Sequence, residues 1–382
     1  MSYNLLHFPT GTNIDRTGDL TYILNTYQPD IFMACEIESA AGSDTILNNC
    51  LGTQNYAGAY FTYNHSGSQY QLQQMLYYNR HKFELVNETY LITYIRDINH
   101  YTLKLLTQDN TDEIFIDIYV AHLKASNSQS DIDTRRDMVQ VLVNDLQNIP
   151  PGHFVIFAGD FNLYTSDEPA YQLMTDANNV IVFKDPVDRA GSWHNNATFK
   201  DIDTQATHST SDNDYVGGGI DDRFDFIMLS ENLINSPVLH YVDGTYAAYG
   251  NNGNCFNKSI ISSYCDGSTY DYTLRSHLYN MSDHLPVVLE LETPVALNMP
   301  VFESQLFKIN EGDVIQNALS VSGGDINHFD LCIYDSAGQQ LIQKSDYRNN
   351  QLINFSNFTP GVYFLQINTP KYHQVIKFVK TD

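Results

Sequence analysis

Apolar runs of strand length alternate with segments of helical periodicity along the first 160 residues. Leu20, Ile23 and Leu24 recur at helical spacing ahead of Pro29, and an apolar run follows directly over residues 31–35. The cycle then repeats with an alternating strand over 114–122, a helix that contains Met138, Val141, Leu142 and Leu146 and ends at Pro150-Pro151, and a buried strand over 154–157. Because strands and helices alternate in this way, we predict a mixed α/β domain.

The chain has 382 residues, which exceeds the usual size of one compact core, so we expect two structural units. The first is predicted over residues 1–293, with its last strand at 285–291. Residues 294–303 contain two prolines and are predicted to form a linker. Short alternating runs separated by Gly and Asn turns then predict a small antiparallel β-sandwich over 304–382.

Acidity is concentrated in the first unit. Residues 1–295 contain 14 Lys and Arg against 37 Asp and Glu, whereas residues 296–382 contain 6 against 8. Nucleic-acid-binding proteins normally neutralise phosphates with Lys and Arg, so this balance argues against an extended basic groove. It favours phosphate contact through bound cations and does not exclude a nuclease. The sequence contains no run of eighteen apolar residues, so it predicts no membrane-spanning helix.

Two segments, residues 187–222 and 242–282, are rich in Asn, Asp, Gly, Ser and Thr, and we predict long loops there around short elements. Within the second segment, Cys255 and Cys265 bracket a polar stretch that one disulfide could close in an oxidising compartment. Two unpaired thiols in a loop are the equal alternative. Five cysteines in all are too few and too irregular for a disulfide framework or a zinc site.

The chain begins with residues that are typical of the middle of a strand, Met1 to Phe8. No basic and apolar leader precedes them. We therefore expect that a signal peptide has been removed or lies upstream.

Polar side chains stand at the ends of several apolar strands, where a buried scaffold can fix them. Asp160 and Asn162 follow the apolar run 154–157. Gly159, which directly precedes Asp160, allows another backbone segment to approach closely. A carboxylate and an amide that converge in this way suit a phosphate held beside a hard cation. An Asx turn that caps the strand is the alternative.

A second pair of candidates is an acid and an imidazole. Asp283 and His284 are adjacent and precede a strand, so their side chains point in opposite directions and serve different partners. Asp225 lies between two phenylalanines, where a carboxylate needs a partner, and His284 is our candidate for that partner. The alternatives are a solvated loop pair for Asp283 and His284, and an ion pair between Asp225 and Arg223.

Two further strand ends carry ionisable groups. His122 continues the inward-facing series of the strand that starts at Ile114, which predicts a core-facing imidazole. Glu36 ends the apolar run 31–35 and could be a metal ligand. A satisfied core histidine and a helix-capping carboxylate are the corresponding structural alternatives.

Taken together and in order, these segments resemble the signature of the endonuclease/exonuclease/phosphatase superfamily across most of residues 1–291. The segments that carry the resemblance are Tyr3-Asn4, Cys35-Glu36, Ala121-His122-Leu123, Gly159-Asp160-Phe161-Asn162, Phe224-Asp225-Phe226 and Ser282-Asp283-His284-Leu285-Pro286. The resemblance implies a four-layer α/β/β/α sandwich of two packed mixed sheets. It also implies hydrolysis of phosphodiesters or phosphomonoesters with Mg²⁺ or a similar cation, with Mn²⁺ and Ca²⁺ as the other candidates.

The resemblance also implies roles for the polar residues. Asn4, Glu36 and Asp283 resemble metal-site residues, Asn162 would orient the scissile phosphate, and Asp160 would act at the leaving oxygen or through the metal. One departure from the pattern is Cys35, where many relatives have Gln or Asn.

The imidazoles have implied roles as well. Asp225 and His284 resemble the acid/base dyad. His122 matches the second histidine of deoxyribonuclease-like members, and Asp97 falls where the carboxylate partner of that histidine is expected.

The tail resembles the C-terminal sorting domain of the type IX secretion system of Bacteroidetes. The resemblance rests on residues 334–341, 358–365 and 375–380, and it implies export by that machinery followed by release or surface attachment. A substrate-binding β-sandwich is the alternative.

We therefore expect a secreted, monomeric, metal-dependent endonuclease or phosphodiesterase with nucleic acid as its substrate. A phosphatase or a sphingomyelinase-like phospholipid esterase is a second hypothesis. A non-catalytic binding module on the same scaffold is the third, which the presence of both histidines and every carboxylate of the set disfavours.

Overall fold

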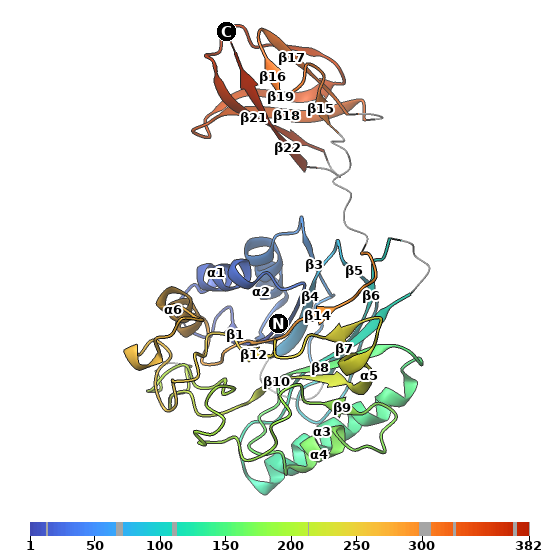
Figure 1. Cartoon of the computed structure of the whole chain (residues 1–382), viewed down its shortest axis with the longest axis vertical. Helices are drawn as coiled ribbons and strands as arrows, with labels where there is room; N and C mark the ends of the chain where they lie inside the picture. The colour runs from blue at the N-terminus through green and yellow to red at the C-terminus, as the bar shows by residue number, and fades with distance from the viewer. Residues whose placement is uncertain are drawn as a thin grey trace. The chain divides into compact units, whose positions relative to one another are not determined.

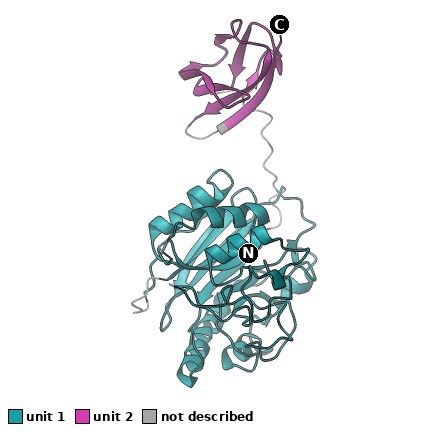
Figure 2. Cartoon of the chain, turned by 90° about the vertical axis from the view of Figure 1, so that its left-hand side faces the viewer, with its two compact units in different colours: residues 1–299 teal, residues 300–382 magenta. Residues whose placement is uncertain are grey.

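A computed structural model of the chain divides into two compact units, Met1–Met299 and Pro300–Asp382 (Figure 2). Of the linker predicted over 294–303, residues 298–303 lie outside the described part of the chain. The residues that the structure describes are 1–12, 14–65, 72–108, 113–212, 214–297, 307–323, 326–369 and 373–381.

The first sheet of unit 1 has the strand order β12-β13-β1-β2-β4-β3. Its two long N-terminal strands, β1 (Ser2–Phe8) and β2 (Ile31–Ile37), are parallel, and the other pairs are antiparallel. The remaining strands of this sheet are β3 (Tyr56–Gly58), β4 (Gln73–Asn79), β12 (Ala247–Ala248) and β13 (Val287–Val288).

The second sheet has the order β5-β6-β7-β8-β10-β9 and is also mixed. Only β7 and β8 run parallel within it. Its strands are β5 (Phe83–Leu91), β6 (Ile98–Leu105), β7 (Phe115–His122), β8 (Phe154–Asp160), β9 (Phe183–Lys184) and β10 (Asp225–Ser230).

Helices lie outside both sheets, which gives the four layers that the family resemblance implies (Figure 1). Alternate residues of β7, such as Ile116 and Val120, pack between the sheets, whereas Tyr119 faces the opposite way and packs with Met138 and Leu142 of the covering helix. On the side of the first sheet lie α1 (Thr17–Tyr27), α2 (Ala40–Thr45) and α6 (Tyr272–Met281), and on the side of the second sheet lie α3 (Gln129–Asp145) and α4 (Pro169–Met174).

Unit 2 is a β-sandwich with its own core. A three-stranded and a five-stranded sheet pack around Phe307, Leu331, Phe355 and Phe378. All strand pairs are antiparallel except that of β16 with β22. The strands are β15 (Lys308–Ile309), β16 (Val314–Ile315), β17 (Ala318–Ser322), β18 (His328–Asp335), β19 (Gln340–Arg348), β20 (Leu352–Asn354), β21 (Gly361–Asn368) and β22 (His373–Lys380).

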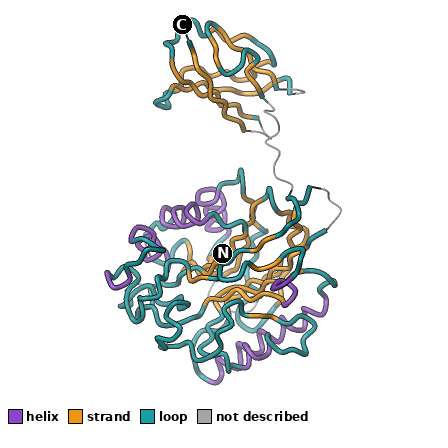
Figure 3. Tube along the Cα trace, viewed as in Figure 1, coloured by secondary structure: helices purple, strands orange, loops and turns teal. Residues whose placement is uncertain are grey.

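Two local predictions for unit 1 were wrong. The segment 242–282, predicted as loop around short elements, ends in the ten-residue helix α6, whose N-cap Asp271 accepts a hydrogen bond from the Leu274 backbone. The predicted strand 285–291 is divided between β13 and β14 (Leu291–Glu292), which pair in different sheets. The segment 187–222 is irregular, as predicted (Figure 3).

Two small elements complete unit 1, α5 (Glu231–Asn235) and β11 (His240–Tyr241). β11 pairs with β14. In the described part of the chain, none of the helices combines the length and apolar character that crossing a bilayer requires.

Candidate active site

Strand register in the second sheet brings three candidate residues side by side. His122, the last residue of β7, is the direct neighbour of Asp160 on β8, and Asp160 is in turn the neighbour of Asp225 on β10. Gly159 makes the close approach possible, because a Cβ there would lie 1.8 Å from the Ala121 carbonyl oxygen. The apolar strands therefore end together, and their terminal polar side chains share one site.

The first sheet contributes from the opposite side. Asn4 of β1 pairs with Cys35 of β2, the residue before Glu36, and the register between the two strands shifts after this pair. The Asn4 Nδ2 group donates to Glu36 Oε1 at 2.9 Å and to Asp160 Oδ2 at 3.1 Å. These two hydrogen bonds join the ends of the two sheets through a single buried amide.

Two of the candidate site residues have a strained backbone conformation. Glu36 has φ of 64° and Asn162 has φ of 51°, in the left-handed region that side chains other than Gly rarely adopt. Such strain costs roughly 1–3 kcal/mol for each residue and is concentrated at functional sites in proteins. In this site, the two strained residues place a carboxylate and an amide at the shared end of the sheets.

Glu36, His122 and Asp160 form a group that could hold a metal ion, with one candidate ligand atom from each within 4.8 Å of the others. His122 Nδ1 lies 3.6 Å from Glu36 Oε1, and His122 Nε2 lies 3.4 Å from Asp160 Oδ2. All three residues are buried. The alternative of a satisfied core histidine does not apply, because His122 Nδ1 has no hydrogen-bond partner among the described residues.

The electrostatics of this group favour an added positive charge. Burial raises the pKa of Asp160 to about 7, and the neighbouring carboxylates Asp225 and Glu36 act in the same direction against the lowering effect of His284. Burial, followed by the Arg96 charge, holds the pKa of His122 well below its ordinary value. His122 is therefore a neutral imidazole, which can act as a ligand or a hydrogen-bond donor.

The dyad predicted from the sequence is formed. His284 Nδ1 lies 2.7 Å from Asp225 Oδ2, which also accepts a 2.7 Å hydrogen bond from the Thr204 hydroxyl. Burial alone would lower the pKa of His284, but the charges of Asp225 and Asp160 raise it well above its ordinary value. The alternative partner for Asp225, Arg223, instead binds Asp185 in a bidentate ion pair at 2.7 and 2.8 Å.

Asp283 lies in a bend and shares one contact with His284, the side-chain amide of Gln205. Its Oδ2 accepts hydrogen bonds from Gln205 Nε2 at 3.2 Å and from the Val216 backbone at 3.1 Å, while Oδ1 has no hydrogen-bond partner in the described chain. Gln205 Nε2 also lies 2.8 Å from His284 Nε2. Gln205 and Thr204 are site residues that sequence reasoning missed, because they lie in an irregular segment without periodicity.

Asp97 was expected to be the carboxylate partner of His122. The Asp97 carboxylate pairs with His65, whose ring Nδ1 and backbone nitrogen both lie 2.8 Å from Asp97 Oδ2. His122 is instead oriented toward Glu36 and Asp160. Sequence reasoning missed His65, because the residues around it show neither helical nor strand periodicity.

Asn162 lies beside the same carboxylate as His122. Its backbone nitrogen donates to Asp160 Oδ1 at 3.1 Å, and its side-chain amide donates to the Leu123 carbonyl at 3.4 Å. The first bond is the Asx-turn geometry that we considered as an alternative. The amide nevertheless stands within the candidate site, so the turn and a functional position coincide.

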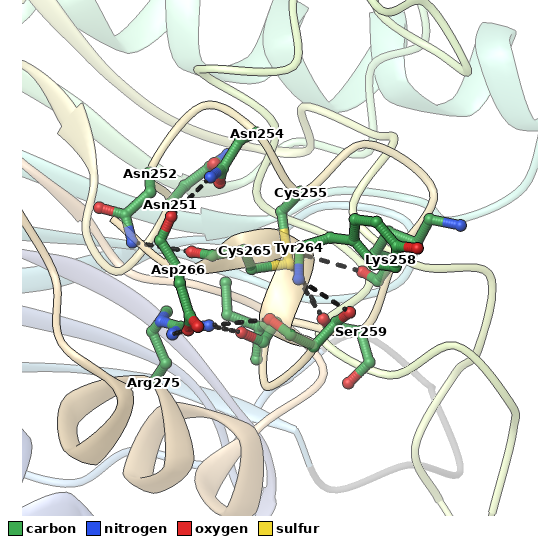
Figure 4. The surroundings of a disulfide bond; sticks show 12 residues. Asn251, Asn252, Asn254, Cys255, Lys258, Ser259, Tyr264, Cys265, Asp266 and Arg275 are labelled. Atoms are coloured by element: carbon green, nitrogen blue, oxygen red, sulfur yellow. Dashed lines mark hydrogen bonds and ion pairs between the residues drawn. A yellow bond between two sulfur atoms is a disulfide. The ribbon is translucent and has the colours of Figure 1, made fainter. Parts of the chain in front are cut away.

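Cys255 and Cys265 form a disulfide with a Cα–Cα distance of 4.7 Å (Figure 4). The loop that it closes supports the irregular segment beside the dyad. The backbone nitrogen of Ile260 donates to the Thr207 carbonyl, and the backbone nitrogen of Thr207 donates to the Asp283 carbonyl. The disulfide thus stabilises a loop that is connected to Asp283 of the candidate site through these two backbone hydrogen bonds.

A cavity of about 390 Å³ opens elsewhere in unit 1. It is lined mainly by apolar residues from both sheets, including Met33, Ile116 and Ile156, with Asp30 and Lys82 among its polar residues. None of the nine predicted site residues lines it, so this cavity is separate from the strand-end cluster.

The four-layer sandwich and its strand-end cluster define a hydrolase fold that acts on phosphoester bonds. The sequence model of the Endonuclease/Exonuclease/phosphatase family matches residues 1–284, and the chain belongs to this family. Residues 315–381 match the Secretion system C-terminal sorting domain, which confirms the predicted type IX sorting domain and indicates secretion or a cell-surface location. No curated protein matches the sequence.

Solved structures resemble the chain at low sequence identity. The human Nocturnin catalytic domain is 17% identical with a TM-score of 0.47, and it covers 76% of this chain and 92% of its own. D. rerio TDP2 humanised by 14 mutations is 15% identical with a TM-score of 0.49, covering 76% and 97%. A Bacteroides thetaiotaomicron mannosyl-6-phosphatase is 13% identical with a TM-score of 0.45, covering 76% and 98%.

Proposed function

We propose that the chain is a secreted phosphodiesterase that depends on a divalent cation, Mg²⁺ by preference, and that nucleic acid is its substrate. One observation carries the proposal: the buried group of Glu36, His122 and Asp160 lies directly beside the His284–Asp225 pair, with 3.8 Å between His284 Nε2 and Asp160 Oδ2. A cation site and an acid/base pair in contact are the two components that phosphodiester hydrolysis requires.

The residues present fit a hard divalent cation. Glu36 and Asp160 would hold it through carboxylate oxygens, with Asp283 as a further oxygen donor. Asn4, whose Nδ2 bonds both carboxylates and whose Oδ1 accepts from the Leu6 nitrogen, would position these ligands. The buried Asp283 Oδ1 and His122 Nδ1 have no hydrogen-bond partner among the described residues, which fits a site that a bound species completes. When bound, the cation would neutralise charge on the phosphate.

The acid/base chemistry is assigned to His284. Because the charges of Asp225 and Asp160 raise the pKa of His284, the ring must first lose a proton, and the neutral ring gains population as pH rises. Its Nε2 would then take the proton of the attacking water, while Asp225 at Nδ1 fixes the ring orientation and stabilises the imidazolium that forms. Asn162 would donate a hydrogen bond to the phosphate and orient it for in-line attack. His122 Nε2 and Asp160 Oδ2 lie 3.4 Å apart, and these two residues would act at the departing oxygen, Asp160 directly or through the cation.

Hydrolysis of plasmid DNA, RNA, sphingomyelin and bis-p-nitrophenyl phosphate tests the proposal, with Mg²⁺, Mn²⁺ and Ca²⁺ each compared with a chelator. We expect turnover of the nucleic acids and of the small diester, and its loss on chelation. The His284→Ala chain should lose turnover with its fold intact, and turnover like that of the wild type would refute the role. No turnover on any substrate would favour a binding module.

A further inference from the structure

Aromatic side chains gather on the surface where the loop after β3 meets the edge strand β5. Tyr60 is 76% exposed, Tyr63 is 51% exposed and Tyr90 is 38% exposed. Phe61 packs edge-on against Tyr63 with 5.1 Å between ring centroids, and His65 stacks on Tyr90 at 4.0 Å with an interplanar angle of 11°. We call these five residues the aromatic platform. Single exposed aromatic residues are ordinary, whereas a group of them marks a binding surface.

The platform is held in place by buried or bonded polar groups. The Tyr60 backbone nitrogen donates to Glu88 Oε2 of β5 at 2.8 Å. His65 is fixed against Tyr90 by two contacts to Asp97, whose side chain is 2% exposed. Rings that are held in this way lose little conformational freedom when a ligand binds, which favours affinity.

The platform adjoins the candidate active site through the backbone. Asp97, which holds His65, directly follows Arg96. The Arg96 guanidinium donates to the carbonyls of His122 at 3.3 Å and Leu123 at 3.2 Å, at the end of β7 where the candidate cluster lies. A ligand bound in the cluster through a phosphate could therefore place its neighbouring group on the platform.

The chemistry of the platform selects the kind of group. Glu88 and Asp97, which anchor it, are acidic, and the first 295 residues carry a large excess of acidic groups. The acidic groups that hold the platform therefore offer no positive charge to a phosphate, and the adjacent Arg96 guanidinium is engaged by the His122 and Leu123 carbonyls. Stacking on tyrosine and histidine faces is independent of charge and suits a planar ring.

We infer that the aromatic platform stacks a nucleobase of a single-stranded nucleic acid, next to the phosphodiester that the candidate site binds. This inference rests on the proposed function and names its substrate class. His65 and Tyr90 already stack on each other, so a base would extend this stack on an outer ring face. Stacking is tolerant of base identity, so the platform selects single strands rather than a sequence. Bases in a duplex are already stacked on one another and are not accessible to it.

The test compares a single-stranded oligonucleotide with one of equal length in which abasic spacers replace the bases next to the cleaved bond. We expect the wild-type chain to cleave the base-bearing strand with a kcat/KM higher by roughly 5- to 150-fold, the range expected for one stacked base. Tyr90→Ala and Tyr63→Ala should each reduce this ratio, and Tyr90→Phe should retain it. Tyr272→Ala, which removes an exposed tyrosine of α6, is the matched control and should leave the ratio unchanged.

A binding measurement separates this inference from the proposed function. The His284→Ala chain is titrated with an oligonucleotide that contains a fluorescent adenine analogue, whose emission is quenched on stacking. Quenching that Tyr90→Ala abolishes supports the platform even if no hydrolysis is found. Equal cleavage of base-bearing and abasic strands with no quenching overturns the inference, while hydrolysis of bis-p-nitrophenyl phosphate would leave the proposed function standing. Equal binding of an uncharged oligosaccharide that Tyr90→Ala also abolishes would overturn the assignment to nucleobases.

Discussion

Replacing Asp225 by Asn isolates the contribution of one buried charge to the proposed reaction. In the wild-type chain, Asp225 Oδ2 accepts from both Thr204 and His284, and Oδ1 has no hydrogen-bond partner among the described residues. An Asn side chain can therefore keep its oxygen at the Oδ2 position and place its NH₂ group where Oδ1 lies. The hydrogen bonds are preserved, and what is lost is the negative charge beside the imidazole.

The expected loss of kcat follows from the burial of the His284–Asp225 pair, since His284 is 4% exposed and Asp225 is 1% exposed. Leaving a buried charge without its partner costs about 3–5 kcal/mol, and here the cost falls on the imidazolium formed during attack. At about 1.4 kcal/mol for each tenfold change, kcat should fall roughly 10²- to 10⁴-fold. Stability should fall by only about 1–3 kcal/mol, because the new amide NH₂ is buried without an acceptor.

The assay is hydrolysis of bis-p-nitrophenyl phosphate at saturating Mg²⁺, with thermal denaturation of each variant. Asp117→Asn is the matched control, because Asp117 is a buried partner of His100 and His153, at 2.7 and 2.6 Å, five residues before His122 on the same strand. It should lower stability and leave kcat unchanged. A loss of less than tenfold for Asp225→Asn would refute the reasoning. The reasoning would also be refuted if the double variant Asp225→Asn with His284→Ala had a much lower kcat than the single variant His284→Ala.

Three other predictions concern the cation, the disulfide and a buried acid. Glu36→Gln should raise the Mg²⁺ concentration needed for half-maximal hydrolysis, and an unchanged cation titration would contradict the assignment of Glu36 as a ligand. Replacing Cys255 and Cys265 by Ser should lower the free energy of unfolding by about 2.7 kcal/mol, from the ten-residue separation, as measured by urea denaturation against the oxidised wild type. Burial, with neighbouring acids, raises the pKa of Asp203 from 3.8 to about 8. Between these two pH values the folded state keeps the proton and the unfolded state has lost it. The free energy of unfolding therefore falls as pH rises, by roughly 1.4 kcal/mol per pH unit. Asp203→Asn should therefore raise the melting temperature more at pH 8 than at pH 5, and an equal change at both would contradict the shift.

The sequence by itself determined the local features of this protein. Apolar periodicity predicted α1, β2, β7, α3 and β8, and the polar residue that ends each strand marked the candidate site. These predictions succeed because strand alternation and helical spacing are properties of neighbouring residues. The His284–Asp225 pair could be proposed for a similar reason, since a carboxylate between two buried phenylalanines requires a partner wherever the chain supplies one.

Only the tertiary structure decided which groups meet. Strand order and register place Asp160 between His122 and Asp225, and the contact of two sheets brings Asn4 to Asp160, 156 residues away in sequence. Irregular loops supply Gln205 and bring His65 to Asp97, the residue that we had expected at His122. Such pairings depend on the closure of long segments whose residues have no periodicity. A single sequence therefore shows that a polar group needs a partner, but only the fold determines which partner it finds.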